Sequence, residues 1–262
     1  IELLRSYGNT VLAVNSGELA SGLVGQGRMM EPEEIVQHLI ENTFRGTSLT
    51  GKHVLISAGP TQELLDPVRY ISNFSTGKMG ICLAEECYLQ GAEVTVVAGP
   101  LQVSTRIQGI NVVNVRSASE MESACLVQAV SSDIIFMAAA VADYRPAIAA
   151  VEKIKKSDAH LTLDLEKTTD ILSVLGAAKK PHQTLVGFAL ETENEEANAM
   201  SKMHRKNTDY IVLNSLKEAG AGFGLDTNQV TIFSASGEKK KVELQSKEGV
   251  AREIIAFVLA KS

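Results

Sequence analysis

The stretch "HVLISAGP", residues 53–60, decides the fold because it joins a buried β-strand to a loop of small residues. The stretch "EVTVVAGP", residues 93–100, repeats this pattern after one helical segment. Two strands with a helix between them at this spacing are typical of a βαβ unit, whose strands are parallel. Helical stretches then alternate with further apolar runs at 110–115, 133–140, 184–191 and 209–214. The chain is therefore predicted to form a doubly wound, mainly parallel α/β sheet of the Rossmann-like type.

The end of the chain is predicted to leave this pattern. The stretch "QVTIFSASGEKKKVEL", residues 229–244, alternates apolar and polar residues on both sides of a Ser-Gly pair. Such alternation is typical of an antiparallel hairpin, and a closing helix is expected to begin near Lys247.

The first 46 residues are predicted to form a separate piece. They contain one strand-like run, a glycine-rich loop and a helix that begins at Pro32, which is too little to enclose a core. We therefore expect residues 1–46 to be the end of a preceding domain with its linker, and residues 47–262 to form the main domain.

The composition argues against several classes of partner. A surface that follows nucleic-acid phosphates needs a basic stripe, whereas the net charge here is −6. The longest apolar run, residues 134–142, is too short to span a bilayer. We therefore expect a cytoplasmic protein with no nucleic-acid or membrane partner. Cys82, Cys87 and Cys125 lack metal-ligand spacing and are expected to be reduced core residues.

Ligands of open α/β sheets bind beyond the carboxyl ends of the strands, which confines the search for a site to the loops there. These loops are expected at 59–78, 141–156, 190–193 and 214–228. The first contains "RYISNFSTGKMG", residues 69–80, whose Gly-Lys pair suggests a Walker phosphate loop. Ser72 and Met79 stand where that motif needs a glycine and a hydroxyl residue, so the motif is absent.

This loop nevertheless predicts a helix start that can bind an anion. Ser75 and Thr76 are N-cap candidates, and Gly77 and Gly80 allow close backbone approach. The free N–H groups of the next turn would then face a phosphate. A capped helix that binds nothing is the alternative interpretation.

The second loop follows "FMAAAVADYRP", residues 136–146. Its alanines remove side-chain bulk, so that a ligand can lie against the backbone, and Asp143 can accept from a ribose or base or help to hold a metal. The run "EKIKK" follows, with Lys153 and Lys155 on one side of an extended segment. This run is either a phosphate clamp or a solvated surface.

A third basic cluster lies in the predicted helix at 194–205. Lys202 and Lys206 are four residues apart and share a face at the C-terminal end of this helix. They either complement the helix dipole or contact a polyphosphate.

Several of these motifs together resemble one enzyme family. The motifs "SAGPTQELLDPVRYISNFSTGKMG", "AAAVADYRP", "EKIKK", "TTDIL", "GFALET" and "RKNTDYIVLN" occur here in the order typical of bacterial phosphopantothenoylcysteine synthetase, over about residues 50–262. The resemblance implies a Rossmann-like sheet with a ribokinase-like extension. It also implies a homodimer whose sites are completed across the interface.

The resemblance implies a two-step ligase of coenzyme A biosynthesis. The carboxylate of 4′-phosphopantothenate attacks the α-phosphate of CTP, in the presence of Mg²⁺, and releases pyrophosphate. The amine of L-cysteine then attacks the acyl-cytidylate and expels CMP. Both steps develop negative charge, which the site is expected to stabilise with fixed donors and cations.

The family roles map onto individual residues. The resemblance makes Asn73 and Lys153 catalytic, with Asn73 contacting the pantothenate part and Lys153 acting in formation of the intermediate. Further substrate contacts are implied for Ala139, Ala140 and Asp143. Nucleotide contacts are implied for Gly59, Ser75, Gly77, Gly80, Asp143, Lys153, Thr169, Asp170, Ile171, Leu172, Phe188, Lys202, Lys206 and Asn214.

Three positions depart from the family pattern, and no metal ligands are assigned. Thr169 stands where proline is common, and Ser215 stands where aspartate is common. The stretch "ELASGLVGQGRMMEP", residues 18–32, is similar to the end of the flavin-dependent phosphopantothenoylcysteine decarboxylase, with Ser21 in place of a common cysteine. We expect FMN to belong only to a preceding decarboxylase part.

Two other functions remain open. An NAD(P)-dependent oxidoreductase would share the βαβ start, although no G-x-G-x-x-G follows the first strand. A non-catalytic nucleotide-binding or assembly module is the second alternative.

Overall fold

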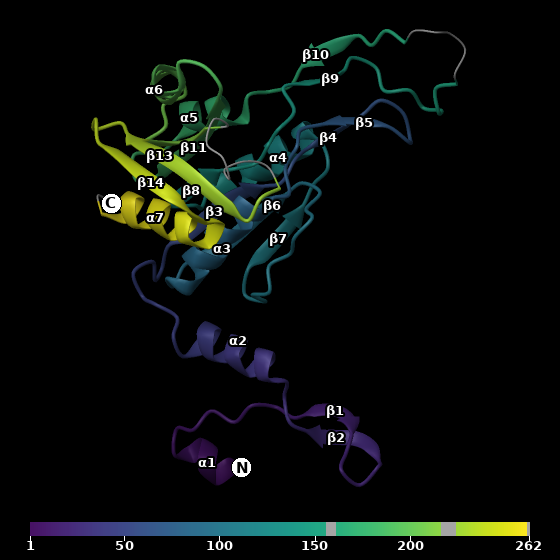
Figure 1. Ribbon diagram of the computed structural model, residues 1–262, viewed down its shortest axis with the longest axis vertical. Helices are drawn as coiled ribbons and strands as arrows, with labels where there is room; N and C mark the ends of the chain where they lie inside the picture. The colour runs from purple at the N-terminus through teal and green to yellow at the C-terminus, as the bar shows by residue number, and fades with distance from the viewer. Residues whose placement is uncertain (156–160, 216–223, 261–262) are drawn as a thin grey trace. The chain divides into compact units, whose positions relative to one another are not determined.

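The computed structural model describes residues 1–155, 161–215 and 224–260 (Figure 1). The chain divides into two compact units, Ile1–Gly46 and Thr47–Ser262. The sequence places a boundary at the same position, and the origin of the first unit in a preceding domain stays a prediction.

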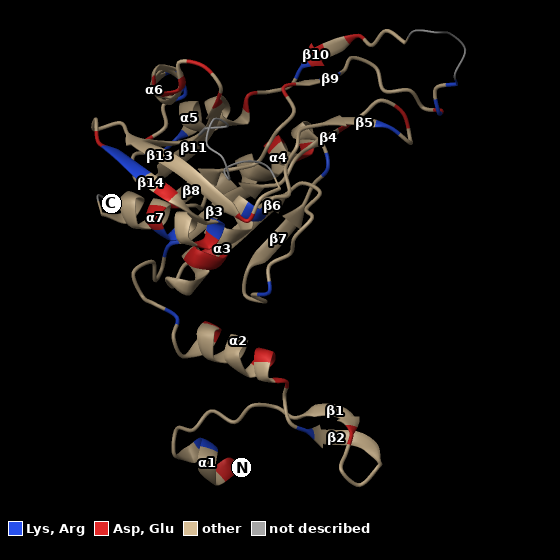
Figure 2. Cartoon of the chain, in the orientation of Figure 1, with Lys and Arg blue, Asp and Glu red and all other residues tan. Residues whose placement is uncertain are grey.

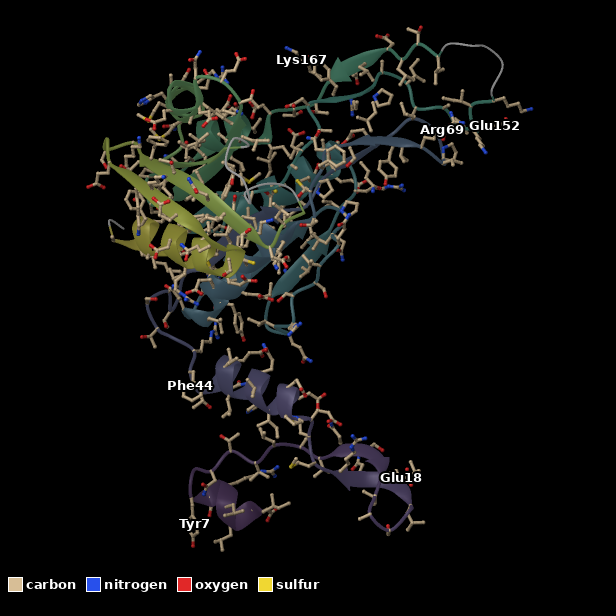
Figure 3. The ribbon with its side chains drawn as sticks, in the orientation of Figure 1. Tyr7, Glu18, Phe44, Arg69, Glu152 and Lys167 are labelled. Atoms are coloured by element: carbon tan, nitrogen blue, oxygen red, sulfur yellow. The ribbon has the colours of Figure 1, made fainter. Side chains whose placement is uncertain are left out.

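The first unit is small and has little apolar packing. It contains α1 (Glu2–Ser6), the antiparallel pair β1 (Asn15–Glu18) and β2 (Val24–Arg28), and α2 (Pro32–Asn42). Helix α2 begins at the predicted proline, and Glu31 and Glu34 form a capping box there. No residue of either helix is buried, and Tyr7 and Phe44 are 72% and 73% exposed (Figure 3).

The second unit is built around an eight-stranded sheet within the described residues. Its strand order is β14-β13-β12-β11-β8-β3-β6-β7, in which the six strands from β12 to β7 are parallel. The hairpin at the other edge is antiparallel, as predicted. The strands are β3 (His53–Ala58), β6 (Glu93–Ala98), β7 (Asn111–Asn114), β8 (Ile134–Met137), β11 (Thr184–Glu191), β12 (Tyr210–Ser215), β13 (Thr227–Ser234) and β14 (Lys239–Ser246).

Helices cover both faces of this sheet (Figure 1). Helices α3 (Lys78–Leu89) and α7 (Lys247–Leu259) pack together on one face, and α4 (Ala118–Ala129), α5 (Ile171–Ala178) and α6 (Glu195–Arg205) pack on the other. Strand side chains alternate between these faces. Val54 and Ile56 join the core under α3 and α7, whereas Leu55 joins the core under α4 and α5. The predicted doubly wound fold is therefore confirmed.

Two short hairpins form an extension at one side of the sheet (Figure 1). Strands β4 (Gln62–Leu64) and β5 (Tyr70–Ser72) pair antiparallel, as do β9 (Tyr144–Pro146) and β10 (Leu165–Lys167). The sequence did not predict them because strands of three residues carry too little alternation to be recognised.

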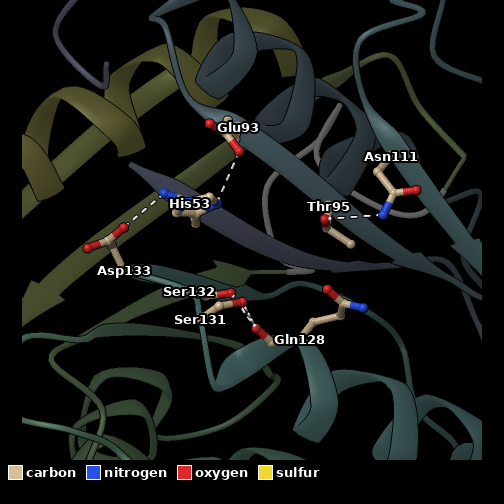
Figure 4. Close-up of polar contacts among 8 residues, drawn as sticks. All are labelled: His53, Glu93, Thr95, Asn111, Gln128, Ser131, Ser132 and Asp133. Atoms are coloured by element: carbon tan, nitrogen blue, oxygen red, sulfur yellow. Dashed lines mark hydrogen bonds and ion pairs between the residues drawn. The ribbon is translucent and has the colours of Figure 1, made fainter. Parts of the chain in front are cut away.

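The amino-terminal edge of the sheet is closed by its own polar contacts (Figure 4). Asp133 accepts a hydrogen bond from the backbone N–H of His53 at 2.9 Å, and His53 Nδ1 lies 3.3 Å from Glu93. Burial raises the pKa of Asp133, but this hydrogen bond and the nearby Lys52 outweigh it, so the pKa is lowered overall. These polar groups therefore contact one another at the edge opposite the carboxyl ends.

Candidate functional site

The carboxyl ends of the parallel strands form a crevice where the direction of winding changes. From β3 the chain continues outward to β6 and β7, and it then returns to β8 on the other side of β3. At this switch point the N–H of Ala140 donates to the carbonyl of Gly59 at 2.9 Å, and Pro60 pairs with Ala140. The loops that follow β3 and β8 are thereby held side by side, where ligands of such sheets bind.

A main cavity of about 520 Å³ opens at this switch point. Its size is that of a small-molecule site. Most residues predicted from the sequence line it: Asn73, Ser75, Gly77, Gly80, Ala139, Ala140, Asp143, Phe188, Lys202 and Asn214.

A side cavity of about 180 Å³ adjoins the main cavity. Asp143, Phe188 and Lys202 line both of them. The segment that the sequence assigned to the base lies here together with Lys206, and it consists of Thr169, Asp170, Ile171 and Leu172.

The loop before α3 shows why glycine stands at position 77. Gly77 is the N-cap of α3, with a φ of 80° that residues with a Cβ rarely adopt. A Cβ here would lie 3.3 Å from the Cα of Gly59, so the two predicted glycines pack against each other. The N-cap prediction for Ser75 and Thr76 is wrong. Their hydroxyls instead accept from the N–H groups of Gly77, the N-cap, and Lys78, the first helical residue.

Gly59 therefore packs against the loop before α3 at Gly77 and does not line either cavity. Gly80 lies close to β3, because a Cβ on it would be 3.1 Å from the Cα of Ala58. The side chain of Asn73 joins this loop to the next, since its Nδ2 donates to the carbonyl of Val141 at 2.9 Å. A predicted catalytic residue thus lies between the loops that follow β3 and β8.

The two predicted lysines, Lys202 in α6 and Lys206 at its C-cap, line the cavities. Lys202 Nζ donates to the carbonyl of Phe188 at 2.9 Å, and Lys206 Nζ lies 2.8 Å from Asp170. Burial and the neighbouring charge of Lys206 lower the pKa of Lys202. Burial raises the pKa of Asp170, but the hydrogen bond from Lys206 outweighs it, so that pKa is lowered overall. Asp170 therefore compensates the charge of Lys206, and Lys202 is the stronger candidate to bind an anionic ligand.

Lys153 is not brought to either cavity of its own chain. It is exposed and lies in the segment after β9, beside Glu152 at the extension (Figure 3). Asp66 accepts from the N–H of Ile154 at 3.1 Å, and Arg69 Nη2 donates to the carbonyl of Ile154 at 2.9 Å. The turn between β4 and β5 thus fixes the backbone next to Lys153. Other predicted features lie outside the described residues: Lys156, the loop part 216–223 and the side chain of Ser215.

Among the cavity residues that the sequence did not predict, three have amide or ammonium side chains: Lys78, Asn228 and Lys247. Lys78 had been set aside with the Walker motif, although it occupies the first position of α3. Asn228 donates to Asn214 Oδ1 at 2.8 Å, and Lys247 begins α7. The predicted hairpin could have revealed Lys247, because β14 runs antiparallel to β13 and therefore ends at the carboxyl edge, where α7 begins.

The lysine run on β14 has a different role. Figure 2 shows its basic stripe at the edge of the sheet. Each lysine of the run has an acidic partner, and the pairs are Lys239 with Glu196, Lys240 with Glu253, and Lys241 with Glu243. The charges of this run are therefore compensated by acidic side chains.

A search of the described residues finds no group of three acidic, histidine or cysteine side chains arranged to hold a metal. It also finds no helix with the length and apolar character needed to cross a membrane. Cys82, Cys87 and Cys125 are buried and free, as predicted, and burial raises the pKa of Cys82 and Cys125 to about 12.

Comparison with known families matches residues 49–261 to the DNA/pantothenate metabolism flavoprotein C-terminal domain. The chain belongs to this family. The predicted resemblance is thereby confirmed, and its extent agrees with the range of motifs found in the sequence.

Curated relatives of the family carry two kinds of name. A "Cysteine/Cysteine sulfinic acid decarboxylase" from an unknown prokaryotic organism is 49% identical over 98% of this chain and 73% of its own length. The "Coenzyme A biosynthesis bifunctional protein CoaBC" of Bacillus subtilis is 44% identical over 100% of this chain and 65% of its own length. The chain thus spans about two thirds of these relatives.

Solved structures agree with the fold. The crystal structure of the C-terminal domain of a coenzyme A biosynthesis bifunctional protein CoaBC has a TM-score of 0.70 and 39% identity, and the match covers 82% of this chain and 98% of that domain. A Cab2 variant in complex with phosphopantothenate-cysteine shares the fold at a TM-score of 0.63 and 17% identity, over 87% of this chain and 92% of its own.

Proposed function

We propose that the second unit is a phosphopantothenate–cysteine ligase of coenzyme A biosynthesis that activates its acid substrate with CTP. The observation that carries this proposal is the main cavity, in which a predicted catalytic asparagine, a floor of alanines and lysines from three helices meet at the switch point. The relatives named for coenzyme A biosynthesis support it.

The chemistry of acid activation suits this arrangement. A carboxylate is a poor electrophile, so its oxygen first displaces pyrophosphate from the α-phosphate of the nucleotide, and the amine of cysteine then displaces the nucleoside monophosphate. Ala139 and Ala140 leave space for the acyl chain beside the backbone. We assign Asn73 to the pantothenate part, because it lies between the two loops that enclose this floor.

The side cavity is proposed to take the nucleotide base. Phe188 lies at the junction of the two cavities and offers an aromatic surface, and the segment 169–172 lines the side cavity. Lys202 and Lys206 then lie where the ribose and first phosphate follow the base, and the lowered pKa of Lys202 would rise again when a phosphate binds.

The residues present fit a magnesium ion held mainly by the nucleotide. Mg²⁺ usually keeps several waters and is bound by one or two carboxylates together with substrate phosphates. Asp143 lines both cavities and is the residue that would hold it. When bound, the ion would neutralise charge on the departing pyrophosphate.

The test is a pyrophosphate-release assay on the full chain with Mg²⁺, 4′-phosphopantothenate and L-cysteine, in which CTP is compared with ATP. We expect cysteine-dependent 4′-phosphopantothenoylcysteine with CTP. Asn73→Ala should retain the fold and reduce product by at least about 100-fold, as for loss of a transition-state donor. No product with either nucleotide would contradict the proposal.

The relative named as a decarboxylase defines one control. Carbon dioxide release from cysteine or cysteine sulfinate, without nucleotide, would favour that activity instead. Binding of NAD(P) would favour an oxidoreductase, and nucleotide binding without turnover would favour a non-catalytic module.

We further propose that the chain acts as a homodimer in the cytoplasm, with Lys153 serving the cavity of a second copy. The support is that Lys153 lies outside its own cavities while its neighbour Ile154 is held firmly. Mixing Asn73→Ala with Lys153→Ala should restore roughly one quarter of wild-type activity, because half of the dimers are mixed and each then holds one intact site. No restoration, with dimers confirmed by light scattering, would contradict completion across the interface.

A further inference from the structure

Two helices begin at the main cavity and each places a lysine at its first position. Helix α3 begins at Lys78 and α7 begins at Lys247, and the two helices pack against each other. Their first turns carry backbone N–H groups without partners within the helix, and helix dipoles make both starts positive. A helix start alone is common, so the side chains decide what this pair of helices can bind.

The two lysines differ in their surroundings. Lys78 Nζ lies 2.7 Å from Asp226 and 3.7 Å from Glu248, and the hydrogen bond from Lys78 to Asp226 raises the pKa of Lys78. Its charge is therefore compensated within the protein. Asp226 and Glu248 themselves are largely exposed, at 84% and 54% of their side chains.

Lys247 is only 6% exposed and lines the main cavity. Among the described residues, no hydrogen bond or ion pair joins its ammonium to an acceptor, although its backbone N–H donates to the carbonyl of Asp226. Its neighbour Cys82 contributes no charge at neutral pH, because the pKa of that thiol is about 12. Burial lowers the pKa of Lys247, and the positive charge of Lys78 also lowers it. The negative charges of Asp226 and Glu248 act in the opposite direction, but the pKa is lowered overall.

Such a residue costs stability unless a ligand uses it. The side chain of Lys247 is largely removed from water and its ammonium has no partner in the described part of the protein, which is unfavourable, and an apolar side chain of similar length would fill the same space without that cost. A bound anion would supply the missing partner. The anion must come from the cavity, since Lys247 lies on its wall.

The position of Lys247 indicates which part of the nucleotide reaches it. Phe188 and Lys202 line both cavities, whereas Lys78 and Lys247 line the main cavity alone. If the base occupies the side cavity, the phosphate chain extends past Lys202 towards the starts of α3 and α7. The last phosphates, which leave as pyrophosphate, then meet these helix starts.

We propose that Lys247 is a binding residue for the terminal phosphates of the nucleoside triphosphate, and for the pyrophosphate that leaves. This assignment deepens the ligase proposal and rests on it. Lys247 is neutralised by these phosphates and adds a charge-assisted contact that nucleoside monophosphate does not make.

The test is isothermal titration of the full chain, with Mg²⁺ present, using Lys247→Met and the matched control Lys239→Met. Lys239 belongs to an exposed ion pair outside both cavities. In Lys247→Met we expect CTP and pyrophosphate to bind about 10- to 100-fold more weakly, the effect of one charge-assisted hydrogen bond, while CMP changes by less than about twofold. The control should leave all three affinities unchanged.

Three outcomes would overturn the assignment. Unchanged CTP affinity would remove Lys247 from the site, and an equal loss for CMP would indicate general distortion. A loss of affinity confined to 4′-phosphopantothenate would instead assign Lys247 to the phosphate of the acid substrate. Thermal melting checks the fold, since Lys247→Met is expected to melt no lower than wild type. If Lys247→Met fails to fold, Lys247→Arg should retain the preference for CTP over CMP, and loss of that preference would overturn the assignment.

The ligase proposal is tested separately. Wild-type chain that gives no cysteine-dependent product refutes the ligase, whatever Lys247→Met does to binding. Wild-type chain that turns over normally, with a Lys247→Met variant that keeps its CTP affinity, refutes the assignment of Lys247 alone.

Discussion

Replacement of Gly77 by alanine tests the packing that positions the loop before α3. Alanine would have to keep a φ of 80°, which costs about 1–2 kcal/mol for a residue with a Cβ. The new Cβ would also lie closer than 3.0 Å to Cδ2 of Leu101. We expect that side chain to move aside by a departure from its rotamer, which costs about 0.5–1.5 kcal/mol. We therefore expect the free energy of unfolding to fall by about 1.5–3.5 kcal/mol and the Tm by about 3–14 °C.

A matched glycine separates the two causes. Gly237 has a φ of 92° in the hairpin turn, but a Cβ added there would meet no atom within 4 Å. Gly237→Ala should therefore show the backbone cost alone in urea denaturation of the full chain, about 1 kcal/mol less than Gly77→Ala. The double variant Gly77→Ala/Leu101→Ala should be more stable, by about that difference, than the sum of the two single losses of stability predicts. Equal losses for the two glycine variants would refute the clash with Leu101.

Three further predictions concern the walls of the site. In Gly176→Ala the new Cβ would clash with the backbone carbonyl of Lys206. Urea denaturation should therefore show a free energy of unfolding lower by about 1–3 kcal/mol, and CTP should bind more weakly. Unchanged stability would contradict this clash. Lys206→Met should raise the pKa of Asp170 towards its ordinary value, visible by NMR titration, and no change would argue against their contact. Asp66→Asn should lose the hydrogen bond from the N–H of Ile154. Because the pKa of Asp66 is lowered in the folded protein, wild type should be more stable than this variant above pH 3.8. This advantage should disappear as the pH falls below 3.8. An advantage that persists in acid would contradict the assignment.

The fold was predictable from sequence where strands were long and apolar. The runs that became β3, β6 and β11 carry enough buried residues to be recognised, and the helical segment between the first two predicts parallel strands. The extension was not predictable, since β4, β5, β9 and β10 have three residues each and pair through backbone geometry that single side chains do not reveal.

The site was predictable where residues follow a strand directly. Asn73 and Asp143 belong to loops whose place at the carboxyl edge follows from the winding, whereas Lys202 was assigned through the family resemblance. Finding Lys247 required one further step, because its place at this edge depends on the antiparallel hairpin that returns the chain and on the packing of α7 against α3. The N-cap of α3 was misjudged because Ser75 and Thr76 are ordinary cap residues, whereas the close approach of Gly59 requires glycine there.

The packing of α3 against α7 has a consequence for synthesis of the chain. The loop before α3 is synthesised before the wall that carries Asn228 and Lys247. Until then, the face of α3 that α7 covers stays open to water. The binding site therefore cannot form until α7 has been made, and premature termination before α7 should yield an aggregation-prone product without affinity for nucleotide.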